Sequence, residues 1–140
     1  MNVQIVNSDK QLEQAYHIRM VVFVEEQNVP PEEELDAYDK DAIHFIGYKE
    51  DVPIAASRLR LVDDYGKLER ICVLKEHRGK SFGKQMIENM EKIIIQKGYK
   101  KAKLNAQTHA ENFYQQLGYE TVSAVFLDAG IPHVTMIKQL

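Results

Sequence analysis

Hydrophobic and polar positions along the chain alternate with the periods of helices and strands. The clearest helical pattern spans about Ser81 to Lys97, where apolar residues recur every four positions and Gly98 follows as a left-handed cap. A second helix is predicted from Ser8 to roughly Val22, because Ser8 and Gln11 have the Ser-x-x-Gln spacing of a capping box. Shorter helices are predicted over 30–34 and 110–117, and strands over 3–5, 42–48, 53–62, 67–74, 103–107, 119–127 and 133–140.

The order of these elements is β-α-α-β-β-β-α-β-α-β-β. Strands joined through the long helix are expected to run parallel, whereas strands joined by tight turns run antiparallel. A chain of 140 residues buries roughly two-thirds of its surface on folding, which is enough for one core. We therefore expect a mixed α/β (α+β) fold around a central, twisted sheet, in a single domain over residues 1–140.

Composition narrows the classes of function. The chain has 18 Lys and Arg against 21 Asp and Glu, a net charge of −3 that argues against nucleic acid as the partner. The longest apolar run, Met20 to Val24, is too short to span a membrane, and the first residues have no signal-peptide pattern. One cysteine cannot form an internal disulfide. We expect a cytoplasmic protein without a nucleic-acid or membrane partner.

The two signs of charge are separated along the sequence. Residues 25–41 contain eight acidic residues and one lysine, whereas residues 75–103 contain nine basic and three acidic residues. Two solvated faces would give this pattern. So would a protein that holds an anionic ligand on one side and a cationic ligand on the other.

A glycine-containing basic loop precedes the long helix. It comprises Arg78-Gly79-Lys80-Ser81-Phe82-Gly83-Lys84. Backbone N–H groups at such a loop and helix start can converge on an anion, and phosphate fits this composition best. Residues 79–83 also match the G-x-S-x-G elbow of serine hydrolases, with Asp128 and His133 following in hydrolase order. However, a polar stretch separates the loop from the preceding strand, which disfavours an elbow.

The loop resembles the pyrophosphate-binding signature of the GCN5-related N-acetyltransferase (GNAT) family, [Arg/Gln]-x-x-Gly-x-[Gly/Ala], with Ser81 at the central glycine. A second family signature, Asn-x-x-Ala-x-x-φ-Tyr-x-x-x-Gly-φ, matches from Gln107 to Tyr119, with Gln107 replacing the asparagine. The segment from Arg19 to Gln27 resembles the bacterial ElaA/YjcF-like branch. The resemblance covers nearly the whole chain and implies an acetyl-CoA-dependent transfer of an acetyl group to an amine.

The resemblance also implies roles for individual residues. Acetyl-CoA would lie between the fourth and fifth strands, with its pyrophosphate on the loop. Tyr114 matches the tyrosine that protonates the departing thiolate; its alternative role is a core aromatic. Glu69 is the first candidate for the general base, with an exposed or Arg70-paired acid as the alternative. The predicted cofactor-binding residues are Ile71, Cys72, Val73, Arg78, Gly79, Lys80, Ser81, Phe82, Gly83 and Lys84.

The acceptor is less defined. Glu26 and His44 are weaker candidates for a base, as is Glu25, and Arg70 is a candidate for holding an acidic group of the acceptor. The acceptor is expected to be a small-molecule amine or a protein amine. Cys72 is expected to be a buried, inert thiol, and no histidine spacing predicts a metal. A non-catalytic acyl-CoA-binding module is the alternative function, and an esterase using Ser81 is a more distant one.

Overall fold

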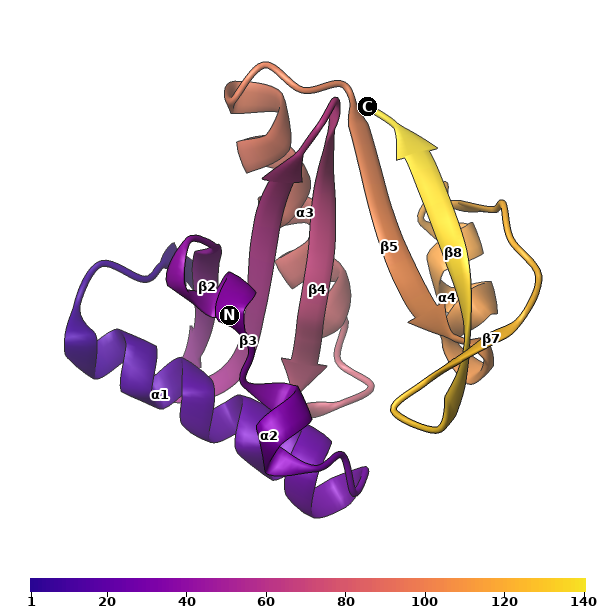
Figure 1. The fold of residues 1–140 in the computed structure, drawn as a ribbon. Coiled ribbons are helices and arrows are strands. Elements are labelled where there is room, and N and C mark those ends of the chain that lie inside the picture. The colour runs from indigo at the N-terminus through magenta and orange to yellow at the C-terminus, as the bar shows by residue number, and fades with distance from the viewer.

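One eight-stranded sheet organises the chain, and the computed structural model describes all residues from 1 to 140 (Figure 1). Its strand order is β1-β2-β3-β4-β5-β8-β6, and β7 also pairs with β8. Only β4 and β5 are parallel neighbours. This arrangement confirms the predicted mixed α/β fold. The strands are β1 Asn2–Ile5, β2 Ile43–Lys49, β3 Val52–Val62, β4 Tyr65–Val73, β5 Lys101–Gln107, β6 Glu120–Thr121, β7 Phe126–Asp128 and β8 Ile131–Gln139.

Helices pack on both faces of the sheet. The α-helices are α1 Asp9–Arg19, α2 Pro31–Glu34, α3 Phe82–Gln96 and α4 Glu111–Gln116. Short 3-10 turns lie at Ala37–Lys40, Lys75–His77 and Thr108–Ala110. The apolar stripe of α3 joins a core of 16 buried residues, whereas α1 covers a second cluster of six. Because both faces of β3 are covered, every side chain from Ile54 to Leu59 is buried.

The first helix differs from its predicted form. Ser8 does cap it, accepting a hydrogen bond from the Gln11 backbone N–H at 3.2 Å. The α-helix ends at Arg19, however, and continues as a π-helix over Met20–Glu26. A π-helix has wider turns than an α-helix and is often found at functional sites. Here it places Phe23 and Gln27 against the cleft described below.

The predicted strand over 119–127 is interrupted. β6 and β7 pair with the same strand, β8, but four residues between them leave the ladder. At the break, the Ser123 hydroxyl oxygen accepts the Thr135 N–H at 2.8 Å, in place of a backbone carbonyl. The side chain thus substitutes for a ladder bond, and β7 then pairs with the start of β8 beside the C-terminal end of β5 (Figure 1).

β4 and β5 diverge after a short parallel contact. They pair only from Gly66 to Leu68 on β4 and from Ala102 to Leu104 on β5. The register between β3 and β4 then shifts between Ala56 and Arg58, and Arg70 adopts a left-handed φ of 56°. This bulge bends β4, and the two strands separate toward their C-terminal ends (Figure 1).

Candidate active site

A cleft of about 260 Å³ lies where β4 and β5 diverge, and we call it the transfer cleft. Both strands line it, together with α4, the π-helix and the β7–β8 hairpin. Its walls include Glu69, Arg70 and Ile71 from β4, and Asn105, Ala106 and Gln107 from β5.

A second cavity, of about 320 Å³, continues the transfer cleft toward α2, and we call it the acidic pocket. Six residues line both cavities, so the two are continuous: Phe23, Gln27, Arg70, Gln107, Asp128 and His133. The acidic pocket has five carboxylate side chains, Glu32, Glu33, Glu34, Asp36 and Asp128. Arg70 is the only arginine or lysine in its lining. This cavity favours a cationic guest.

The glycine loop leads directly into α3. Gly79 has a φ of 78°, and Ser81, the N-cap residue of α3, has a left-handed φ of 64°. The Ser81 side chain makes no capping bond, so the N–H groups of the first helical turn remain available to an anion. Lys80 and Lys84 are exposed beside them, but the Phe82 side chain is buried in the core. Only the backbone of Phe82 can therefore face a ligand.

Arg78 of the loop is held by Glu26 at the end of the π-helix. The guanidinium donates to both Glu26 carboxylate oxygens, at 2.5 and 2.8 Å, and its Nε donates to the Val73 carbonyl at 2.9 Å. The hydrogen bonds from Arg78 lower the pKa of Glu26. Glu26, predicted to contact the acceptor, thus lies against the predicted cofactor loop.

β4 presents a free backbone edge to the transfer cleft. Leu74 donates its N–H to Ile54 of β3 at 2.9 Å. Because backbone direction alternates along a strand, the N–H groups of Ile71 and Val73 point to the opposite edge, from which β5 has diverged, and Ile71 lines the transfer cleft. The backbone of Cys72 faces β3 instead, as the partner of Ala56.

The Cys72 thiol is buried on the α1 side of the sheet and donates to the Ala56 carbonyl at 3.6 Å. Burial raises its pKa to about 12. The thiolate, which is the reactive form, is therefore not populated at neutral pH.

Tyr114 of α4 lines the transfer cleft. Its ring packs edge-on against Phe113 at 5.1 Å and Tyr119 at 6.0 Å between ring centroids. The hydroxyl makes no hydrogen bond to the protein, and desolvation raises its pKa to about 12. A phenol in this state keeps its proton at neutral pH and can donate it.

Glu69 also lines the cleft, but cations engage its carboxylate. One oxygen accepts from Arg58 at 3.0 Å, and the other lies 3.2 Å from Lys67 and 3.5 Å from Arg60. The sequence suggested Arg70 as the partner of Glu69; the ion pairs form with these three other residues instead. To take up a proton, Glu69 would have to weaken them.

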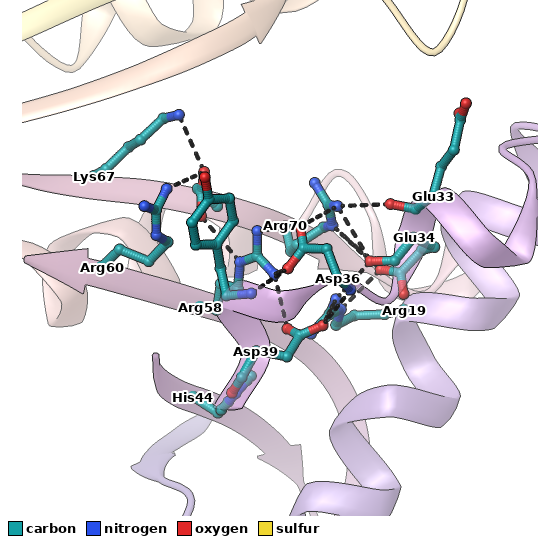
Figure 2. Close-up of polar contacts among 12 residues, drawn as sticks. Arg19, Glu33, Glu34, Asp36, Asp39, His44, Arg58, Arg60, Lys67 and Arg70 are labelled. Carbon is teal, nitrogen blue, oxygen red and sulfur yellow. Dashed lines mark hydrogen bonds and ion pairs between the residues drawn. The ribbon is translucent and has the colours of Figure 1, made fainter. Parts of the chain in front are cut away.

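A buried ion-pair network fixes the segment that forms the acidic pocket (Figure 2). Arg19 and Arg58 are 0% and 1% exposed, respectively. Arg19 pairs with Glu34 at 2.8 Å and Asp39 at 2.7 Å, and Arg58 pairs with Asp36 at 2.6 Å and Asp39 at 2.8 Å. Burial opposes ionisation of Asp39, but hydrogen bonds from both arginines hold its pKa well below the usual range. The network ties α1 and β3 to the 34–39 segment.

Two predicted acceptor residues have structural partners. Arg70 donates to the Glu33 carbonyl at 3.2 Å and the Glu34 carbonyl at 3.1 Å, joining β4 to α2 (Figure 2). It still lines both cavities. His44 is buried outside them, its Nε2–H donating to the Asp39 carbonyl at 2.8 Å, and burial lowers its pKa.

Three hydrogen-bonded polar side chains of the cleft, Gln27, Gln107 and His109, had no role predicted from the sequence. Gln107 donates to the Gln27 amide oxygen at 2.8 Å and accepts from His109 Nε2–H at 2.6 Å. The hydrogen bond between Gln107 and Gln27 joins residues that are 80 positions apart in the sequence. Only Gln107 had a sequence signal, its place in the second motif.

The hydrolase-like residues do not form a triad. The Ser81 hydroxyl makes no hydrogen bond to a histidine, and Ser81 lines neither cavity. His133 Nδ1–H is directed to the Ile131 carbonyl at 2.6 Å, within its own hairpin. No group of three or more His, Cys, Asp or Glu is placed to hold a metal ion. No helix has the length and apolar character needed to cross a membrane.

The mixed sheet thus opens between its only two parallel strands, and a glycine loop precedes the helix that follows the first of them. Residues 13–140 match the acetyltransferase (GNAT) domain family, so the chain belongs to the GNAT acetyltransferases and is an acyltransferase. It is 45% identical to the uncharacterized N-acetyltransferase YjcF of Bacillus subtilis, over 99% of each chain.

Solved structures agree on the fold. The crystal structure of Escherichia coli ElaA is similar, with a TM-score of 0.88, 30% identity and coverage of 99% of each chain. A GNAT acetyltransferase from Elizabethkingia anophelis, crystallised with acetyl-CoA bound, has a TM-score of 0.78 at 15% identity. It covers 99% of this chain and 97% of its own. The suspected family and branch are confirmed.

Proposed function

We propose that the protein transfers the acetyl group of acetyl-CoA to a primary amine, directly and within a ternary complex, in the cytoplasm. The transfer cleft carries the proposal. A free edge of β4 runs beside it, and that edge leads to the glycine loop at the start of α3. An extended molecule with amide groups at one end and a pyrophosphate at the other suits this path.

The residues present fit acetyl-CoA. The first-turn N–H groups of α3, with Lys80 and Lys84, would hold the pyrophosphate. The N–H of Val73 would donate to the thioester carbonyl oxygen, where negative charge develops during attack. The acetyl-CoA-bound neighbour from Elizabethkingia anophelis supports this use of the fold.

Direct transfer is favoured because the chain offers no side chain suited to carrying the acetyl group. The only cysteine, Cys72, is buried with a raised pKa. Ser81 has no neighbouring base to activate it. With neither side chain suited to the task, attack on the thioester by the acceptor amine itself is the simpler route.

The acidic pocket favours a cationic acceptor. A lysine-like ammonium has a pKa of about 10.4 and arrives protonated at neutral pH. Glu32 and Glu33 are exposed at the pocket and form no ion pair, so they would attract and orient such a group, whereas Asp36 is already paired with Arg58 and Arg70. The acceptor can be a small molecule or a flexible protein amine.

Tyr114 would protonate the departing thiolate, because its phenol keeps its proton and makes no competing hydrogen bond. An ammonium must also lose a proton before it can attack. Glu69 lines the cleft and is the base that the sequence suggests, although Arg58, Arg60 and Lys67 compete for its carboxylate.

The test is the release of free thiol from acetyl-CoA across a panel of polyamines, amino acids and lysine peptides. Initial rates at varied concentrations of both substrates should give intersecting reciprocal plots. Parallel plots would indicate an acetylated enzyme and refute direct transfer. An inactive panel with clear acetyl-CoA binding would favour the alternative, a non-catalytic acyl-CoA-binding module.

A further inference from the structure

His133 of β8 lines both the transfer cleft and the acidic pocket. Its side chain is 9% exposed, so it belongs to the wall of the joined cavities rather than to the outer surface. Of the six residues that line both, His133 is the only histidine, the residue type that most often serves as a general base. It therefore stands where the acidic pocket, which we propose for the amine, joins the transfer cleft.

The hydrogen bond at the other ring nitrogen fixes the tautomer of His133. Nδ1 lies 2.6 Å from the Ile131 carbonyl oxygen. A carbonyl only accepts, so Nδ1 carries the hydrogen, and in the neutral ring Nε2 carries the lone pair. Nε2 has no hydrogen-bond partner in the protein. The accepting nitrogen is thus free to bind a ligand N–H.

The imidazole ring is also held in one orientation. It stacks on Phe126 of β7, with ring centroids 6.0 Å apart and an interplanar angle of 23°. Its backbone pairs with Gln107 of β5 on one side and Phe126 on the other. A base placed on a strand between two paired neighbours keeps its position during the reaction.

The other candidate bases in the cavities are less suited. Three cations engage Glu69. His109 lines only the transfer cleft and not the acidic pocket, and it is exposed to solvent. Asp128 is an exposed carboxylate, and carboxylates are weaker bases than imidazole.

We propose that His133 Nε2 is the general base that deprotonates the acceptor; this rests on the proposed acetyltransferase function. An N–H bond of the acceptor ammonium breaks, and its proton moves to Nε2. The freed amine lone pair forms the new N–C bond to the acetyl carbon, and the C–S bond breaks. The sulfur takes a proton from Tyr114, which regains one from the acetylated nitrogen through solvent. His133 then releases its proton to water.

Labelling with S-bromoacetyl-CoA tests the position of His133 without knowledge of the acceptor. An Nε2 that reaches the acetyl position displaces bromide from the adjacent methylene carbon and leaves the thioester intact. We expect one adduct, mapped to His133 by peptide mass spectrometry and suppressed by excess acetyl-CoA. Bound reagent with no adduct on His133, or with the adduct on Glu69 or His109, would overturn the proposal. Absence of acetyl-CoA binding by calorimetry would instead overturn the proposed function.

Turnover provides the second measurement, with an amine identified by the panel. We expect kcat to fall by about 10²–10⁴-fold in His133→Gln, the usual effect of losing a positioned base, with acetyl-CoA affinity unchanged. Free imidazole should partly restore the rate in His133→Ala. The matched control His17→Gln should stay within about twofold of the parent, since His17 is exposed on α1 and lines neither cavity. Equal losses in the two histidine variants, or no rescue by imidazole, would contradict a base at His133.

Discussion

Gly83 provides the sharpest test of the phosphate site. It is the second residue of α3, and a Cβ added there would lie 3.7 Å from the Phe113 ring, an ordinary van der Waals contact. A small side chain therefore fits. Gly83→Asp places a carboxylate among the N–H groups that the pyrophosphate would use, whereas Gly83→Asn adds the same volume without the charge.

The size of the effect follows from the charge alone. Two like charges about 5 Å apart repel by about 0.8 kcal/mol in water and by about 3 kcal/mol at an effective dielectric of 20. These values correspond to a loss of affinity of roughly 4-fold to 200-fold. An acid in the first helical turn stabilises the free protein by about 0.3–1 kcal/mol. Gly83→Asp should therefore bind acetyl-CoA more weakly while melting no lower than Gly83→Asn.

Isothermal titration of acetyl-CoA into both variants measures the difference. The gap between Asp and Asn should narrow in 1 M salt, because salt screens the repulsion. Gly83→Ala is the control for steric change and should bind like the parent. If the Asp and Asn variants bind equally well in low salt, the pyrophosphate does not lie at this helix terminus, and the cofactor assignment fails.

Three further predictions address the other parts of the molecule. Glu26→Gln should tighten acetyl-CoA binding a few-fold by titration calorimetry, because an exposed ion pair worth up to about 1 kcal/mol no longer competes for Arg78; weaker binding would mean that Glu26 supports the site. Tyr114→Phe should lower kcat by about 10²-fold at unchanged acetyl-CoA affinity. In the parent protein, the pKa of about 12 should keep Tyr114 protonated, so its titration should cause no loss of rate below pH 10. A rate within about twofold of the parent, with chemistry rate-limiting, would remove the acid role. Gly66→Ala should destabilise the fold by about 1–3 kcal/mol in urea unfolding, since its Cβ would lie 2.4 Å from Ile94 of α3; an unchanged midpoint would show that α3 can move aside.

Local sequence was enough for the elements that carry their own signals. The apolar stripe of α3, the Ser8 cap and the glycines that end helices act over a few residues, so their structure follows from spacing alone. The loop from Arg78 to Lys84 was found for the same reason, because glycine and basic residues beside a helix start are visible in sequence. The π-helix and the break between β6 and β7 were not, because each depends on bonds made in the folded chain.

The active site was decided mostly by tertiary structure. Arg58 lies in an apolar strand, and nothing nearby in sequence predicts that it binds Asp36, Asp39 and Glu69 from two other segments. His133 likewise looks like a hairpin residue until β8 packs beside β5 and brings it to the cavities. Ion pairs and proton transfers act over a few ångströms, whereas these partners are separated by tens of residues. A sequence can therefore supply the chemical groups and the fold that carries them, but only the packed sheet determines which of those groups meet.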